Sequence, residues 1–147
     1  MLANLYNNFC VAALGINFTL SYAKELSISK ALLVMPFIMH NETVNYLSAR
    51  NRNVRSIDEL IIAQPNLFLN FNKRYYESLE ASLNAIQFLN DIDWITIEDG
   101  LIKQEQYIPF NNEMGERLKK IFKSSSNLAN ILSDDNNKLY LSLRIEL

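Results

Sequence analysis

The segment "DWITIEDGLIKQ" (residues 93–104) decides the fold predicted for this chain. Two runs typical of β-strands, ITIE and LIKQ, flank Asp99-Gly100, a dipeptide that tolerates the two positive φ angles of a tight hairpin turn. Such a turn pairs Ile97 with Ile102 across an antiparallel hairpin. Three isoleucines then share one face, which we expect to be buried: Ile95, Ile97 and Ile102.

Helical patterns precede this hairpin. Ser56 and Glu59 have the spacing of a capping box, which predicts the start of a helix that ends at Pro65. Apolar residues at helical spacing continue through residues 66–90, as one helix or as two with a break near Asn72. Three helices followed by a hairpin over residues 56–105 are typical of a winged helix-turn-helix. We therefore predict a mainly α fold with a small β-hairpin wing.

Residues 4–26 form the clearest predicted helix, because apolar residues recur at steps of three and four over a broad stripe. This helix is either the central helix of the domain or one that a partner also covers. The apolar run 31–39 is much shorter than the roughly 20 residues that a membrane-spanning helix needs. It is predicted as buried structure, with the helix broken at Pro36 and a second helix starting near Asn41.

The remainder of the chain is predicted to be helical as well. Residues 112–122 and 126–134 indicate two short helices, and residues 138–147 indicate a strand or a last helix. No repeat or linker divides the chain, so we expect a single domain over residues 1–147. Its expected parts are an N-terminal helical part (1–50), a winged-helix-like part (56–105) and C-terminal helices (111–147).

Composition excludes several classes of function. A formal net charge of -2 lacks the strongly basic balance expected of an autonomous DNA-binding protein. The single cysteine, Cys10, cannot form an intrachain disulfide, which favours a reducing compartment and hence the cytoplasm. Lys24 is the first basic residue, so the positive start of a secretory signal is missing.

The sequence does not indicate catalysis. His40 is the single histidine, so a His-based zinc cluster is excluded, and we expect it to serve as a capping or core residue. A catalytic pair of Cys10 and His40 is formally possible, but Cys10 lies in an apolar helix where a buried, inert thiol is expected. The three glycines are too scattered to form a phosphate-binding loop. We therefore expect no enzyme activity, no metal and no cofactor.

Charged residues indicate where partners bind. Acidic side chains dominate residues 77–93 and the hairpin tip, and they would repel phosphate there. In the polar loop 48–56, Arg50, Arg52 and Arg55 can form bidentate hydrogen bonds with partner carboxylates or with phosphates. The alternative is a solvated loop. Aromatic and arginine residues are enriched at interfaces, so the candidate interface residues are Arg50, Arg52, Arg55 and an expected exposed pair, Tyr75 and Tyr76.

The order of these segments resembles a known family. "YNNFCVAALGINFTLSYAKE", then "SKALLVMPFIMHNETVNYL", then the arginine loop and the helix from Ser56 to Pro65 are similar to middle components of ABC-three component systems, close to Lamassu-type anti-phage defence. "MPFIMH" (35–40) followed by Thr43 is the most recognisable marker. The resemblance covers residues 4–105, and "NKRYY" departs from it by lacking prolines.

The resemblance implies a small winged-helix adaptor that works with an SMC-like ABC ATPase and an effector, often a nuclease. It implies no active site, and it implies contact with DNA only through the complex, with no membrane partner. The alternative left open by the residues is a free-standing winged-helix DNA-binding transcriptional regulator.

Overall fold

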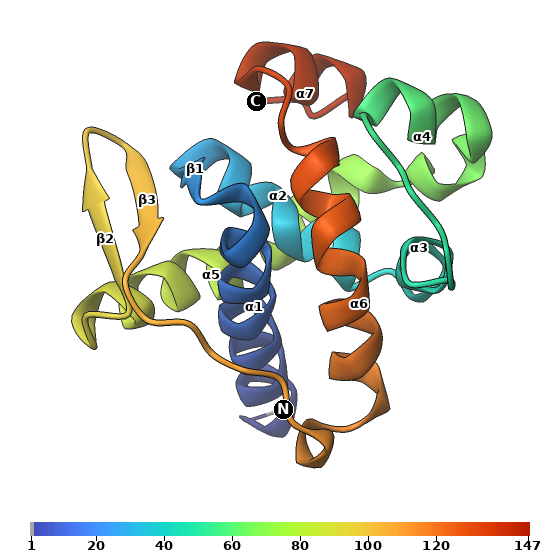
Figure 1. The fold of residues 1–147 in the computed structure, drawn as a ribbon. Coiled ribbons are helices and arrows are strands. Elements are labelled where there is room, and N and C mark those ends of the chain that lie inside the picture. Colours follow the sequence, from blue (N-terminus) through green and yellow to red (C-terminus); the bar gives the residue numbers. More distant parts are fainter. Residues whose placement is uncertain (1) are drawn as a thin grey trace.

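The computed structural model describes the backbone of residues 2–147 and the side chains of residues 8–147. The described chain is mainly helical, with one small antiparallel sheet, as predicted (Figure 1). In chain order its elements are α1 (Leu2–Ala23), β1 (Glu25–Ser27), α2 (Ile28–Ile38), α3 (Asn41–Leu47), α4 (Ile57–Ala63), η1 (Pro65–Phe68), α5 (Phe71–Asp91), β2 (Ile95–Glu98), β3 (Leu101–Gln104), η2 (Asn112–Met114), α6 (Glu116–Ile131) and α7 (Asn136–Ser142).

The hairpin β2–β3 has the predicted turn and register. Asp99 and Gly100 have φ angles of 54° and 76°, and Ile97 lies opposite Ile102. Ile95 and Ile102 are buried, but Ile97 is 36% exposed, so the predicted burial of all three isoleucines is wrong. Ile97 lies on an edge strand of the sheet, next to the turn, where little of the chain covers it. The sheet order is β1-β3-β2, and the three-residue strand β1 was not predicted.

The helices that pack behind the sheet differ from the predicted unit. Helix α5 packs on α1 and α2, which also pack on each other, whereas α4 packs on η1, α6 and α7. The hairpin therefore packs on α1, α2 and α5, and two of these helices precede the segment 56–105 in the chain. Figure 1 shows the hairpin on one side of α1 and the loop between α3 and α4 on the other, beyond α6.

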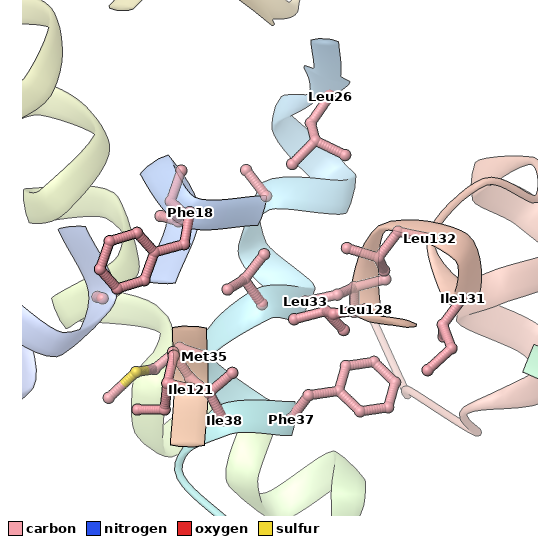
Figure 2. Close-up of a cluster of buried hydrophobic side chains, with 14 of the residues drawn as sticks. Phe18, Leu26, Leu33, Met35, Phe37, Ile38, Ile121, Leu128, Ile131 and Leu132 are labelled. Atoms are coloured by element: carbon pink, nitrogen blue, oxygen red, sulfur yellow. The ribbon is translucent and has the colours of Figure 1, made fainter. Parts of the chain in front are cut away.

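A hydrophobic cluster connects elements from all along the chain. Side chains of α1, α2 and α6 meet in it, among them Phe18, Leu33 and Leu128 (Figure 2). Helices α1 and α2 approach closely at Gly15, where an added Cβ would lie 2.3 Å from Ile38 Cδ1. The apolar run 31–39 is buried within this cluster, as predicted.

Helix α2 continues through Pro36, so the predicted break at this proline is wrong. Proline removes one helical N–H donor, but the following turn is intact, with the Met39 N–H donating to Met35 O at 2.9 Å. The Pro36 carbonyl accepts from Arg74 Nε at 3.1 Å. A second helix does begin at Asn41, as predicted.

The prediction of two short helices over residues 112–122 and 126–134 is wrong. Residues 116–131 form the single helix α6, because the hydroxyls of Ser124 and Ser125 donate to Lys120 O and Ile121 O and so remain satisfied inside the helix. For residues 66–90 the structure has the two-helix alternative, with the short helix η1 followed by α5, and the break lies at Asn70, in the left-handed conformation, close to the expected Asn72. The capping contact at α4 is confirmed, since Ser56 Oγ accepts from the Glu59 N–H.

Candidate partner-binding surface

The arginine loop, residues 48–56, is held against α6 by the amide side chains of Asn127, which is buried, and Asn130, which is exposed. Asn127 Oδ1 accepts from the Val54 N–H at 2.9 Å. The Asn127 amide nitrogen donates to Leu47 O at 2.9 Å and to Arg52 O at 3.1 Å. Asn130 adds a hydrogen bond to Val54 O at 3.1 Å. The loop lacks helix and strand, as predicted, but its backbone is fixed and its arginine side chains are exposed.

Arg52 is oriented by Tyr46. Its guanidinium lies 3.9 Å from the centre of the Tyr46 ring, and its Nε donates to Tyr46 O at 3.2 Å. A guanidinium has five N–H donors, so most of those of Arg52 are available to a ligand. Stacking and a single backbone hydrogen bond thus fix the plane of the group before any partner arrives.

Arg50 and Arg52 line the same surface hollow, of about 530 Å³, together with Lys123 of α6 and Tyr22 of α1. Among the described residues that line this hollow, none is acidic. Tyr22 is 52% exposed. Arg55 does not line the hollow. The structure therefore brings together two of the three predicted arginines and adds a lysine and a tyrosine from other elements.

Tyr75 and Tyr76 do not form an exposed pair, so this prediction is wrong for Tyr75. Tyr75 is only 5% exposed, and its hydroxyl lies 3.3 Å from that of Tyr140. The Tyr140 hydroxyl donates to Ser29 O at 2.6 Å, and burial is the main cause that raises its pKa. Neighbouring positions on α5 face different surroundings, because successive helical residues are turned by about 100°. Tyr76 is 46% exposed, and its hydroxyl donates to Glu146 O.

The predicted acidic surface is present on α5 and the hairpin. Six carboxylates there are exposed: Glu77, Glu80, Asp91, Asp93, Glu98 and Asp99. The molecule therefore has an acidic side at the hairpin and a basic hollow beside the arginine loop.

Residues with possible chemistry are dispersed. His40 Nδ1 lies 2.8 Å from Thr43 Oγ1, and burial, followed by the charge of Arg74, lowers the His40 pKa. Cys10 is exposed, so the expected buried thiol is wrong: Cys10 lies on a part of α1 that the core does not cover. Among the described side chains, no group of three or more His, Cys, Asp and Glu is arranged to hold a metal ion.

Sequence reasoning missed two members of the hollow. Lys123 lies among several lysines of a late helix and Tyr22 among the apolar residues of the first helix, and neither local pattern marks a binding residue. Asn127, which holds the loop, carries no local signal, since asparagine is common on exposed helix surfaces. Only the packing of α6 against the loop and α1 brings these residues together.

These features define a small, mainly helical protein with a preformed basic hollow on its surface. The chain belongs to the family of Middle Component 3 of ABC-three component (ABC-3C) systems, whose family model matches residues 1–147. The resemblance to ABC-3C middle components is thereby confirmed and extends past residue 105. No curated protein and no solved structure matched the chain. Within residues 2–147, no helix combines the length and apolar character needed to cross a membrane.

Proposed function

We propose that this protein is a non-catalytic adaptor subunit of an ABC-3C system, linking an SMC-like ABC ATPase to an effector, often a nuclease, in anti-phage defence of the Lamassu type. The observation that carries the proposal is the match of the middle-component family model to the whole chain. In this role the adaptor works in the cytoplasm, needs no cofactor, and contacts DNA only through the complex.

The arrangement of the fold supports an adaptor with more than one binding side. The sheet with α1, α2 and α5 is proposed as the winged-helix unit, with α3 and α4 inserted between α2 and α5. Its acidic helix and hairpin disfavour phosphate and favour contact with protein. The arginine loop lies on the other side of α1 (Figure 1), so two partners can bind without overlap.

The proposed contacts use the exposed members of the predicted interface. Arg50, Arg52 and Arg55 project from a loop whose backbone is held by α6. Tyr76 is 46% exposed on α5. Arginine and tyrosine are common anchors of interfaces because each combines a large contact area with hydrogen bonding.

Affinity purification of the tagged protein from its own host tests the adaptor role directly. We expect a large ATPase and a second protein to co-elute in a fixed ratio, with mass spectrometry identifying the chains. A lone monomer or homodimer eluting under gentle conditions contradicts the proposal.

Charge reversal of Arg50, Arg52 and Arg55 together is expected to weaken partner recovery while leaving the thermal midpoint nearly unchanged. Their side chains are exposed, and surface substitutions usually alter the free energy of unfolding by no more than about 0.5 kcal/mol. A matched control reverses Lys73, Lys103 and Arg117, which are also exposed but lie outside the loop. Equal partner recovery by both triple variants removes the loop from the interface.

The second candidate function is a free-standing DNA-binding regulator, which the basic hollow favours. Phosphate contacts make the affinity for duplex fall steeply with salt. Tight, salt-dependent binding of duplex by the purified protein alone, without partner proteins in the host, would put this function first.

A further inference from the structure

The hollow lined by Arg50, Arg52 and Lys123 is the middle section of a longer groove. Arg52 and Asn51 also line a neighbouring hollow of about 300 Å³ between the arginine loop and α4. On the other side, Tyr22 and Ser126 line a further hollow of about 490 Å³ that reaches β1. Adjacent hollows share lining residues, so the three lie in a row along the surface, and we call this row of hollows the basic groove. Such a row suits an extended chain better than a single small ion.

The charges along the basic groove change from one section to the next. Arg50, Arg52 and Lys123 line the middle section. Glu59 lines the section beside α4, and Glu25 lines the section beside β1, where Lys30 is also present. A ligand that follows the whole groove therefore meets positive charge in the middle and a carboxylate in each outer section.

This pattern discriminates between the two classes of polyanion. A nucleic acid carries a phosphate at every step, so it would place negative charge against Glu25 and Glu59 as well as against the arginines. A peptide can carry carboxylates in its middle and neutral or basic residues at its ends. Tyr22, exposed at the junction of two sections, provides an aromatic surface for a peptide side chain.

The middle section is also preorganised. The Asn127 side chain fixes the loop backbone at Val54 and Arg52, and stacking on Tyr46 fixes the Arg52 guanidinium. Little ordering of the protein is then needed when a ligand binds, which favours affinity. Planar arginine groups held in this way suit bidentate contact with carboxylates.

We propose that the basic groove binds an extended acidic segment of a partner protein, with the carboxylates of the segment meeting Arg50, Arg52 and Lys123. This deepens the proposed adaptor function and rests on it, since it names the chemistry of the partner. The adaptor thereby recognises a short linear segment, and the rest of the partner remains free to move.

Fluorescence anisotropy with labelled probes tests the proposal. The probes are a peptide that alternates Glu and Leu in its middle and has neutral Ser and Gly residues at both ends, the same peptide with Gln in place of Glu, and an oligothymidylate of matching length, all at low ionic strength. We expect the Glu peptide to bind most tightly and the Gln peptide at least about tenfold more weakly. Tighter binding of oligothymidylate makes nucleic acid the occupant and overturns the proposal, as does a lack of binding by the Glu peptide.

Two double variants locate the binding. Arg50→Glu with Lys123→Glu reverses one charge on the loop and one on α6 inside the groove, and should weaken the Glu peptide about tenfold or more. Lys73→Glu with Arg117→Glu makes the same change at two exposed side chains that do not line the groove and should alter affinity less than about threefold, since solvent screens distant charges. Equal weakening in both variants, or none in the first, contradicts the proposal.

The two proposals fail in different ways. If wild type and the Arg50→Glu, Lys123→Glu variant recover the same amount of partner, the adaptor function stands and the proposed role of the groove is contradicted. If the peptide binds as expected but no partner is recovered from the host, the role of the groove stands and the adaptor function is contradicted. Thermal midpoints of both variants close to that of wild type show that folding does not account for either result.

Discussion

At the scale of single residues, Arg74 is the clearest example of a charged side chain used for structure. It is 9% exposed, and its guanidinium donates to three backbone carbonyls, Pro36 O at 3.1 Å, Leu69 O at 2.8 Å and Leu67 O at 3.0 Å. The group thus ties the end of α2 to the turn before α5. Positive charge at a helix C-terminus is also favourable to the helix dipole. Burial lowers the Arg74 pKa.

Replacement of Arg74 by Met is expected to reduce the free energy of unfolding by roughly 3 kcal/mol, because it leaves buried carbonyls without donors. Urea unfolding followed by circular dichroism measures this. Lys73→Met, one position earlier and exposed, serves as the control and should shift stability by no more than about 0.5 kcal/mol. Similar midpoints for the two variants would show that the three hydrogen bonds add little.

His40 makes stability depend on pH. Burial is the main cause that lowers the His40 pKa from 6.5, and the charge of Arg74 is the second. The folded protein therefore favours the neutral ring. The unfolded chain then binds more protons than the folded one just below pH 6.5. The contribution of His40 to the free energy of unfolding is therefore complete above the pKa that His40 has in the unfolded chain. It is lost as the pH falls towards the lower pKa of the folded protein.

The variant His40→Gln is expected to lose less stability than wild type on acidification from about pH 7 to about pH 5. His40 is the single histidine, so the difference between the two urea-unfolding series isolates its contribution. Parallel curves for wild type and variant over this range would contradict the role assigned to His40.

At the scale of elements, features that depend on neighbouring residues were predicted correctly, whereas features that depend on tertiary packing were not. The Asp99-Gly100 turn and the Ser56 cap depend on a few neighbouring residues, and both were predicted. Pro36 and the serines of α6 look like helix breaks in sequence, yet both helices are continuous, and the serine hydroxyls of α6 donate to carbonyls of the preceding turn. Strand β1 has three residues and exists through pairing with β3. No local pattern predicts such contacts.

The contact between α1 and α2 can be tested at Gly15. Alanine favours helix by about 1 kcal/mol over glycine, but its Cβ would lie 2.3 Å from Ile38 Cδ1 in a closely packed core. Overpacking costs about 1–3 kcal/mol, so Gly15→Ala should lower the free energy of unfolding.

Ile38→Val removes the obstructing methyl and by itself costs about 0.5–1.5 kcal/mol. The double variant should therefore be more stable than the sum of the two single effects indicates, a coupling that urea unfolding of all four proteins measures. Strict additivity would mean that Ile38 rotates away at no cost and that the close approach does not constrain the helices.

At the scale of the whole molecule, charge is arranged on two sides. The acidic side on α5 and the hairpin was predicted from composition, because each segment carries its own carboxylates. Of the residues that line the basic groove, Arg50 and Arg52 were predicted as candidates, whereas Lys123 and Tyr22 were not. The lining comes from α1, the arginine loop and α6, which are distant in sequence. Family resemblance and whole-chain match agree on the class of protein, while the groove depends on tertiary structure alone.

The expectation of a single domain also belongs to this scale. The hydrophobic cluster includes residues from α1 to α7, among them Leu139, which is fully buried. Trp94, the single tryptophan, lies at the base of the hairpin and packs against the same cluster. If the chain folds as one unit, disturbing α7 must destabilise the surroundings of Trp94, although the two belong to different elements.

Leu139→Ala is therefore expected to lower the urea midpoint of Trp94 fluorescence and of circular dichroism together, by about 2–5 kcal/mol in the free energy of unfolding. Leu141→Ala makes the same chemical change on the same helix at a side chain that is 79% exposed, so it should cost no more than about 0.5 kcal/mol. A circular dichroism transition that shifts while the fluorescence transition stays in place would show that α7 unfolds separately. The basic groove, built from α1, the loop and α6, would then have to be assigned to one of two independently folding parts.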